Sequence, residues 1–272
     1  MLSTVYSGAV QGVDAYQVEI EVNAGHGDPQ VVTVGLPDAA VKESKDRVYT
    51  AMINSGFKTH VGRTTINLAP ADIKKEGPIY DLPIAIGMLA AQEDIESAQL
   101  AEFAMLGELA LSGEVRRVKG VLPIALNAKS AGKQGILVPA DNAEEAAVVE
   151  GLDVYPVSTL REAADFINGT LPLEPCCVDV DKIFSQITEH EDNYADVKGQ
   201  EQAKRAIEVA VAGGHNILMI GPPGTGKTML AKRIPSILPE MSLEEALQAT
   251  KIHSIAGTLD PHSALIERRP FR

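Results

Sequence analysis

The 272-residue chain has no tryptophan, only two cysteines and few aromatic residues, with six tyrosines and five phenylalanines. Cys176 and Cys177 are adjacent, so they offer neither a disulfide framework nor a metal-binding spacing, and we expect free thiols in a reducing cytosol. No apolar run approaches the roughly 20 residues of a membrane span. The first residues lack the basic and apolar regions of a signal peptide. The sequence therefore predicts a soluble, cytoplasmic protein.

Basic residues are too few to favour non-specific binding of nucleic acid. The formal net charge is −13, and residues 1–169 hold 23 acidic and 13 basic side chains against 14 and 11 in residues 170–272. An acidic surface repels a phosphate backbone. Any contact with DNA has to come from a local patch or from the second half.

A glycine- and proline-rich stretch dominates the second half of the chain. Residues 221–228 fit the pattern G-x-x-x-x-G-K-[ST], with four apolar residues before them at 217–220 and an apolar-periodic run after them. The apolar residues predict a short buried β-strand and the later run predicts a helix, which is the setting of a phosphate-binding loop. Its glycines let backbone N–H groups surround phosphate oxygens at a helix N-terminus. We predict that the chain binds ATP with Mg²⁺.

Two residues of this loop have predicted chemical roles. Lys227 is expected to reach the β- and γ-phosphates as the catalytic residue, and the Thr228 hydroxyl is expected to be the Mg²⁺ ligand. The predicted nucleotide-binding residues of the loop are Gly221, Pro222, Pro223, Gly224, Thr225, Gly226, Lys227, Thr228 and Met229.

Residues 1–169 mix strands and helices without a regular βαβ repeat. Alternation at 18–22, a turn at 25–29 and a return at 31–35 predict a β-hairpin. Asp38 is expected to cap a helix that ends near Gly56. Further strands are expected at 64–68, 104–108, 135–139 and 153–156, and further helices at 84–91, 122–131, 140–149 and 159–168. This pattern predicts an α+β domain.

A linker is predicted between that domain and the phosphate-binding loop. Residues 170–195 contain two prolines and the charged run 189–192, with little apolar periodicity. A helix is then expected at 201–212. We therefore predict an N-terminal domain at 1–169, a linker at 170–195 and a nucleotide-binding domain at 196–272.

Several stretches carry a family resemblance. Residues 196–206 (DVKGQEQAKRA) and 213–216 (GGHN), followed by the loop, resemble the AAA+ module of magnesium-chelatase-like ATPases. Residues 2–9 (LSTVYSGA), 34–38 (VGLPD) and 76–85 (EGPIYDLPIA) resemble the YifB/ComM branch of that group. The resemblance extends over the whole chain in order.

The resemblance implies a fold and a function. It implies an N-terminal domain of the ribosomal-protein-S5-domain-2 type, as in the catalytic domain of Lon proteases, followed by an α/β P-loop AAA+ domain. It implies ATP hydrolysis by a homo-oligomeric ring, a hexamer, and a motor that moves on DNA during branch migration in natural transformation. Val197 and Gln200 are similar in position to residues that pack the adenine in related modules.

The sequence also departs from this family pattern. An AAA+ ATPase needs an acidic pair after a second apolar strand, and no such strand is predicted between Thr228 and Arg272. The pair Glu244 and Glu245 is expected on the solvated face of a helix. We therefore expect an N-terminal fragment that ends within the ATPase domain and does not turn over ATP alone.

Proteolysis is not expected. Lon-like domains use a Ser–Lys dyad, and the stretch that resembles their serine loop has Ile79 at the nucleophile position. The segment that carries their lysine is missing after Leu122–Ile124, and Lys129 is expected to be a solvated helix lysine. Asp81 is expected to cap the next helix. The basic clusters 74–75 and 116–119 are expected in solvated loops, with contact to DNA or a neighbouring subunit as the alternative.

Two other functions stay open. The chain could belong to a magnesium-chelatase subunit, although dedicated chelatase motor subunits begin close to the AAA+ core. It could also be a nucleotide-dependent scaffold without motor activity, in which the Lon-like domain binds protein partners.

Overall fold

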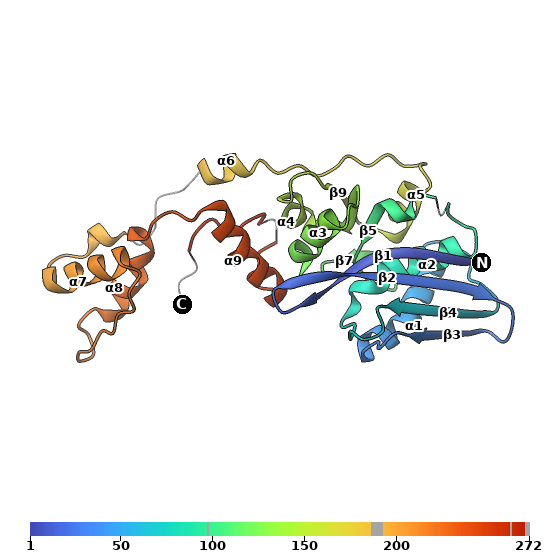
Figure 1. The fold of residues 1–272 in the computed structure, drawn as a ribbon, viewed down its shortest axis with the longest axis horizontal. Helices are drawn as coiled ribbons and strands as arrows, with labels where there is room; N and C mark the ends of the chain where they lie inside the picture. Colours follow the sequence, from blue (N-terminus) through green and yellow to red (C-terminus); the bar gives the residue numbers. More distant parts are fainter. Residues whose placement is uncertain (97, 186–192, 262, 270–272) are drawn as a thin grey trace. The chain divides into compact units, whose positions relative to one another are not determined.

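The computed structural model describes residues 1–96, 98–185, 193–261 and 263–269. The chain divides into two compact units (Figure 1). The first contains Met1–Val178 and Lys251–Ala264, and the second contains Asp179–Thr250 and Leu265–Arg272. Among the described residues, no helix is long and apolar enough to cross a membrane.

A seven-stranded mixed sheet forms the centre of the first unit, with the strand order β3-β4-β2-β1-β5-β8-β9. The strands are β1 (Leu2–Gln11), β2 (Asp14–Gly25), β3 (Gln30–Val34), β4 (Arg63–Ala69), β5 (Phe103–Met105), β8 (Gly135–Pro139) and β9 (Asp153–Val157), and the short strands β6 (Glu108–Leu109) and β7 (Val115–Arg116) form a separate ribbon. The helices of this unit are α1 (Ala39–Asn54), α2 (Asp81–Ala91), α3 (Val121–Ser130), α4 (Ala143–Ala147) and α5 (Leu160–Ile167), with 3₁₀ turns η1 (Pro78–Tyr80), η2 (Leu100–Glu102) and η3 (Ala140–Asn142).

Helices cover both faces of the β1–β2 hairpin. Gly87 of α2 lies so close to Val5 and Val22 that a Cβ there would be 2.8 Å from a Val22 methyl. On β1, Gly8 faces Ile124 of α3, where a Cβ would be 2.5 Å away. Successive residues of a strand point to opposite faces of the sheet, so residues 5 and 8 lie on different faces. Helices α2 and α3 therefore cover opposite faces. All eleven residues of α2 are buried, as expected for a helix enclosed by the sheet and its neighbours.

Most of the predicted elements of this unit are confirmed. Asp38 caps α1 by accepting the Val41 N–H at 2.8 Å. The strands β4, β8 and β9 and the helices α2, α3 and α5 lie within one to three residues of their predicted positions. The mixed character of the fold also holds. The run β5-α3-β8-α4-β9, however, is a regular parallel βαβ series, which we did not predict because its strands have only three to five residues.

The predicted hairpin between residues 18–22 and 31–35 is wrong. Strand β2 pairs antiparallel with β1 on one side and with β4 on the other, and β3 pairs parallel with β4. The turn after Gly25 therefore passes across β4 to reach β3. The true hairpin is β1–β2, whose turn at Gly12 is two residues long. The predicted strand 104–108 is likewise divided between β5 and β6.

Asp81 is not the N-cap of α2, contrary to expectation. It is the first residue of α2, and Tyr80 occupies the N-cap position without a side-chain hydrogen bond. Arg47 donates to both Asp81 carboxylate oxygens, at 2.9 and 3.1 Å, and the Leu109 N–H donates at 3.2 Å. Burial raises the pKa of Asp81 to about 6, against the opposing effect of Arg47. The carboxylate joins α1, α2 and the β6 strand from inside the unit.

Lys75 is also placed differently from the prediction. Its side chain is fully buried rather than solvated, and its ammonium donates to the carbonyls of Ile73, at 2.7 Å, and Pro70. Its backbone pairs with the segment after β3, through hydrogen bonds to Leu36 and Asp38. Burial lowers the pKa of Lys75. The ammonium therefore fixes the loop that precedes α2.

The second unit contains helices and no assigned strand among its described residues. Its elements are α6 (Val180–Ser185), η4 (Tyr194–Asp196), α7 (Glu201–Ala212), α8 (Lys227–Arg233), η5 (Ile234–Ile237) and most of α9 (Leu243–Ala256). Its core is a small cluster of Tyr194, Val197, Ile207 and Leu230. Residues 186–192 of the predicted linker, including the charged run, lie outside the described residues.

The pairing of β3 with β4 can be tested at a glycine. Gly35 has a φ of +95°, and a Cβ there would be 2.1 Å from the Leu68 carbonyl oxygen of β4. We expect Gly35→Ala to lower the free energy of unfolding by about 3 kcal/mol or more, because backbone strain and overlap add. Urea denaturation measures this loss.

Gly12→Ala is the matched control. Gly12 also has a positive φ, +66°, but its Cβ would meet no atom within 4 Å. The expected loss is only about 1 kcal/mol, from the conformation alone. Equal losses in the two variants would contradict the close approach of β3 to β4.

Candidate nucleotide-binding site

The predicted phosphate-binding loop lies between α7 and α8 in the second unit. Gly226 is the N-cap residue of α8, and both Gly224 and Gly226 have positive φ values, +82° and +83°. No side chain caps α8. The first N–H groups of an uncapped helix have no intrahelical acceptor, so they are open to an external one. The sequence forms this turn because glycine alone adopts two such φ values without strain.

Lys227 folds back over its own loop. Its ammonium donates to the carbonyl oxygens of Gly221 and Pro222, each at 2.8 Å, and lies 3.4 Å from the Thr225 hydroxyl. Thr225 also donates its hydroxyl to Pro222 at 3.0 Å. These contacts hold a positive charge at the centre of the loop.

The other predicted loop residues are exposed to solvent. Pro223 lies at the loop surface, and the Thr228 hydroxyl and the Met229 side chain lie on the exposed side of α8. Thr228 immediately follows Lys227, so the hydroxyl and the ammonium come from the first turn of the same helix. The roles of these residues stay predictions.

Gln200 and Val197 have different surroundings. Gln200 has a φ of +60°, and its side-chain amide donates to the Thr225 carbonyl at 3.5 Å, so it lies beside the loop. Val197 is 2% exposed and packs in the core cluster with Leu230 of α8. Val197 therefore packs against the buried side of α8, the helix that carries Lys227. Whether either residue contacts an adenine stays a prediction.

The predicted buried strand before the loop is not formed. Residues 217–220 have no regular structure, and Leu218 and Ile220 are 82% and 87% exposed. A strand requires neighbours that satisfy its N–H and C=O groups, and the described part of the second unit supplies none. The four apolar residues are of types that suit a strand, but their pattern does not identify a neighbouring strand with which they would pair.

Glu244 and Glu245 lie in helix α9, as predicted. The Glu245 N–H donates to Ser242 Oγ at 3.2 Å and the Ser242 N–H donates to Glu245 Oε2 at 3.0 Å, which is a capping box. Arg269 donates to both Glu245 oxygens, at 3.0 and 2.9 Å. These bonds, first the one from Ser242, lower the pKa of Glu245. Glu245 therefore has a structural role at the start of the helix, and Glu244 is exposed beside it.

The loop residues fit a nucleotide with Mg²⁺. The loop offers unpaired backbone N–H groups, and the ammonium of Lys227 and the hydroxyl of Thr228 are in consecutive positions. Its glycines also leave open space for a ligand. A Cβ at Gly224 would have no atom within 4 Å, and one at Gly226 would have its nearest neighbour, a Met229 methyl, at 3.4 Å. These are donors for phosphate oxygens and a ligand for a hard cation. Elsewhere among the described residues, no group of three or more His, Cys, Asp or Glu could hold a metal ion.

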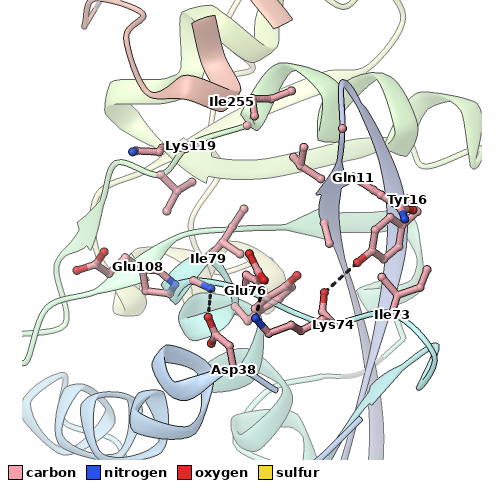
Figure 2. A pocket seen from close by; sticks show the side chains of 18 of the residues that line it. Gln11, Tyr16, Asp38, Ile73, Lys74, Glu76, Ile79, Glu108, Lys119 and Ile255 are labelled. Atoms are coloured by element: carbon pink, nitrogen blue, oxygen red, sulfur yellow. Dashed lines mark hydrogen bonds and ion pairs between the residues drawn. The ribbon is translucent and has the colours of Figure 1, made fainter. Parts of the chain in front are cut away.

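The first unit holds a second candidate site, a cavity of about 910 Å³ beside the end of β1 (Figure 2). We call it the β1 cleft. It is lined by Ala9, Val10, Gln11, Gly12, Tyr16, Asp38, Asp72, Ile73, Lys74, Glu76, Gly77, Pro78, Ile79, Tyr80, Glu108, Arg117, Val118, Lys119, Gly120 and Ile255. Ile79, at the position that resembles the Lon serine, is therefore in the cleft wall, whereas Lys129 is exposed on α3 and does not line the cleft.

Polar groups of the cleft are arranged around the loop before α2. Tyr16 donates its hydroxyl to the Lys74 carbonyl at 3.4 Å, and the Lys74 ammonium pairs with Glu76 at 2.7 Å (Figure 2). The Gly77 N–H donates to Asp38 at 3.1 Å. Burial raises the pKa of both Tyr16 and Tyr80. In the basic cluster 74–75, Lys74 thus lines the cleft and Lys75 is buried.

Sequence reasoning did not identify Tyr16 and Tyr80 as site residues. Tyr16 belongs to β2 and Tyr80 to the turn η1, and neither occurs in a motif with a known chemistry. Both line the β1 cleft because the start of β2 lies beside the loop before α2, where the Tyr16 hydroxyl donates to the Lys74 carbonyl. Nothing in the local pattern predicts that proximity.

Family models match two parts of the chain. A model described as "Subunit ChlI of Mg-chelatase" matches residues 20–142, and one described as "Magnesium chelatase, subunit ChlI" matches residues 193–272. The second match contains the whole of the predicted phosphate-binding loop.

Three relatives show how far the similarity extends. "Uncharacterized protein YifB" of Escherichia coli is 44% identical over 272 residues, 100% of this chain and 52% of the relative. "Competence protein ComM" of Haemophilus influenzae is 43% identical over 275 residues, covering 100% and 53%. "Lon protease 2" of Bacillus subtilis is 24% identical over 200 residues, covering 64% and 36%. The chain spans about half the length of the first two relatives.

Proposed function

Because this chain belongs to the YifB/ComM family of magnesium-chelatase-like proteins, we propose that it is the ATP-binding part of an AAA+ ATPase. The observation that carries the proposal is the glycine loop before α8, in which Lys227 and Thr228 follow an uncapped turn. In this function, the backbone N–H groups of residues 224–228 and the Lys227 ammonium hold the phosphates, and the Thr228 hydroxyl holds Mg²⁺. Bound Mg²⁺ neutralises phosphate charge.

Lys227 must change partners for this role. Its ammonium now donates to two loop carbonyls, and phosphate oxygens are stronger acceptors because they are charged. The exchange leaves the Gly221 and Pro222 carbonyls at an exposed loop, where water can replace the ammonium. Gln200, beside Thr225, is proposed to border the nucleotide, with Val197 supporting α8.

Hydrolysis is proposed for the full-length protein and not for this chain alone. Turnover needs a carboxylate that positions water. In residues 193–261 and 263–269, Glu245 of the adjacent acidic pair is engaged at the start of α9, and Glu244 is exposed on the same helix. We propose the domain boundaries 1–169, 170–195 and 196–272, with the first domain of the S5-domain-2 type found in Lon proteases. The likeness to Lon protease 2 supports that assignment.

The finer function that we propose is a DNA motor. The relative named competence protein ComM aligns with the whole of this chain, which supports a role in competence. The motor is proposed to be a cytoplasmic homo-hexameric ring that couples ATP hydrolysis to branch migration. A magnesium-chelatase subunit is the second candidate, since both matching family models are described by that enzyme.

ATP binding is tested at Lys227. We expect Lys227→Ala to weaken the binding of a fluorescent ATP analogue by about 10- to 100-fold, because a charge-assisted hydrogen bond to phosphate is lost. Lys232→Ala is the control, since Lys232 is an exposed lysine of the same helix. Unchanged affinity in Lys227→Ala, or an equal loss in both variants, would exclude the loop as the phosphate site.

The motor is tested by turnover in the full-length protein. We expect ATP hydrolysis to rise several-fold with a branched DNA junction and to be abolished by Lys227→Ala. Hydrolysis that is indifferent to DNA but stimulated by a porphyrin and the partner subunits of a chelatase would favour the second candidate. Hydrolysis that no substrate stimulates would reject both motors while leaving ATP binding intact.

A further inference from the structure

The β1 cleft contains an open strand edge. Strand β1 pairs with β2 along its whole length, from Leu2 to Gln11. On its other side it pairs with β5 at Tyr6 and Ala104, because β5 has only three residues. In the described part of the first unit, no strand continues this side along residues 8–11. Ala9, Val10, Gln11 and Gly12 line the cleft instead.

The free edge presents backbone donors and acceptors to the cleft. In an antiparallel pair, alternate residues direct their N–H and C=O groups away from the partner strand. Alternate backbone groups of residues 8–11 therefore point away from β2. An edge of this kind is a template for one more strand, which an extended peptide can supply.

Tyr80 provides an independent sign of a ligand. Its side chain is 1% exposed, and its hydroxyl has no hydrogen-bond partner among the described residues. That hydroxyl lies in the electrostatic field of Tyr16, Asp38 and Glu76, which also line the cleft. A buried hydroxyl without a partner costs free energy. A carbonyl oxygen of a bound chain would satisfy it.

The charge balance of the cleft fits a polypeptide better than a nucleic acid. Four acidic and three basic side chains line it, and Lys74 is already paired with Glu76. Asp72 and Lys119 have no ion pair or hydrogen bond within the described residues, and the Asp72 carboxylate acts at longer range on Tyr16 and Lys75. A polyanion gains nothing from this balance. The apolar part of the wall includes Val10, Ile79 and Ile255, which suit aliphatic side chains.

We propose that the β1 cleft binds an extended polypeptide segment, which adds as a strand to the edge at residues 8–11 and whose main-chain carbonyl accepts the Tyr80 hydroxyl. Recognition is then mostly through the backbone, with alternate aliphatic side chains on the apolar wall. Since Ile79 offers no nucleophile in this wall, the segment is held and not cleaved. The site is separate from the loop that we propose for ATP.

The first experiment measures peptide binding to the full 272-residue chain. The probe is a fluorescein-labelled nonapeptide that alternates valine with serine and glutamine, followed by fluorescence anisotropy. The control peptide has the same side chains and an N-methyl group at every residue, which removes its backbone N–H donors and keeps the side-chain donors. We expect at least tenfold weaker binding of the methylated peptide. Equal binding of the two peptides, or no binding of either at millimolar concentration, would overturn strand addition.

The second experiment uses two buried hydroxyls that lack partners. Ser7 Oγ resembles Tyr80 in having no partner among the described residues, but it does not line the cleft. Tyr80→Phe and Ser7→Ala should each raise Tm by roughly 2–4 °C, because each removes an unsatisfied buried group. Only Tyr80→Phe should weaken peptide binding, by about tenfold. Unchanged peptide affinity in Tyr80→Phe, or an equal loss in Ser7→Ala, would contradict the proposed contact.

A charge-matched test separates peptide from nucleic acid. A labelled single-stranded oligonucleotide of fifteen bases should not compete with the nonapeptide. Asp72→Asn removes a cleft carboxylate, and Asp28→Asn removes an exposed carboxylate of the turn before β3, outside the cleft lining. Competition by the oligonucleotide that strengthens in Asp72→Asn and not in Asp28→Asn would assign the cleft to nucleic acid and overturn the proposal.

Discussion

Pairing of strand backbones is the constraint on which the first unit depends. In the first unit, β1 and β2 satisfy each other along their full length, and their apolar faces are covered by α2 on one side and α3 on the other. Around this hairpin, β4 and then β3 extend the sheet in one direction and β5, β8 and β9 in the other. The same constraint explains the two places where pairing is incomplete, the end of β1 and the apolar segment before the phosphate-binding loop.

The two incomplete places have opposite chemical surroundings. At the end of β1, the open edge borders a cleft with the buried Tyr80, the half-buried Tyr16 and nearly balanced charge. The neighbouring turn is fixed by the buried ammonium of Lys75. Before the loop, Leu218 and Ile220 are exposed beside glycines and an ammonium. The first arrangement suits a neutral, extended chain and the second suits phosphate. The two places therefore differ in the kind of ligand that their side chains and backbone groups suit.

Local signals were enough to predict what depends on neighbours in the sequence. The Asp38 cap, the buried face of α1 and the glycine turn before α8 follow from side-chain periodicity and from φ preferences. Non-local facts were missed for a physical reason. The insertion of β4 between β2 and β3, the Arg47–Asp81 ion pair and the Tyr16–Lys74 hydrogen bond each join segments separated by tens of residues. Hydrophobic periodicity and secondary-structure propensity carry no information about contacts between residues so far apart in the sequence. The same limit explains why a strand was expected at residues 217–220.

The most direct test of the account is amide hydrogen exchange across residues 217–230, with and without Mg²⁺ and ATP. We expect slowed exchange at the N–H groups of residues 224–228 when nucleotide is added, because these groups gain phosphate acceptors. Exchange at Leu218 and Ile220 should stay fast in both states, because no strand covers them in this chain. Unchanged exchange at residues 224–228 under saturating ATP would contradict the central claim that this loop holds the phosphates.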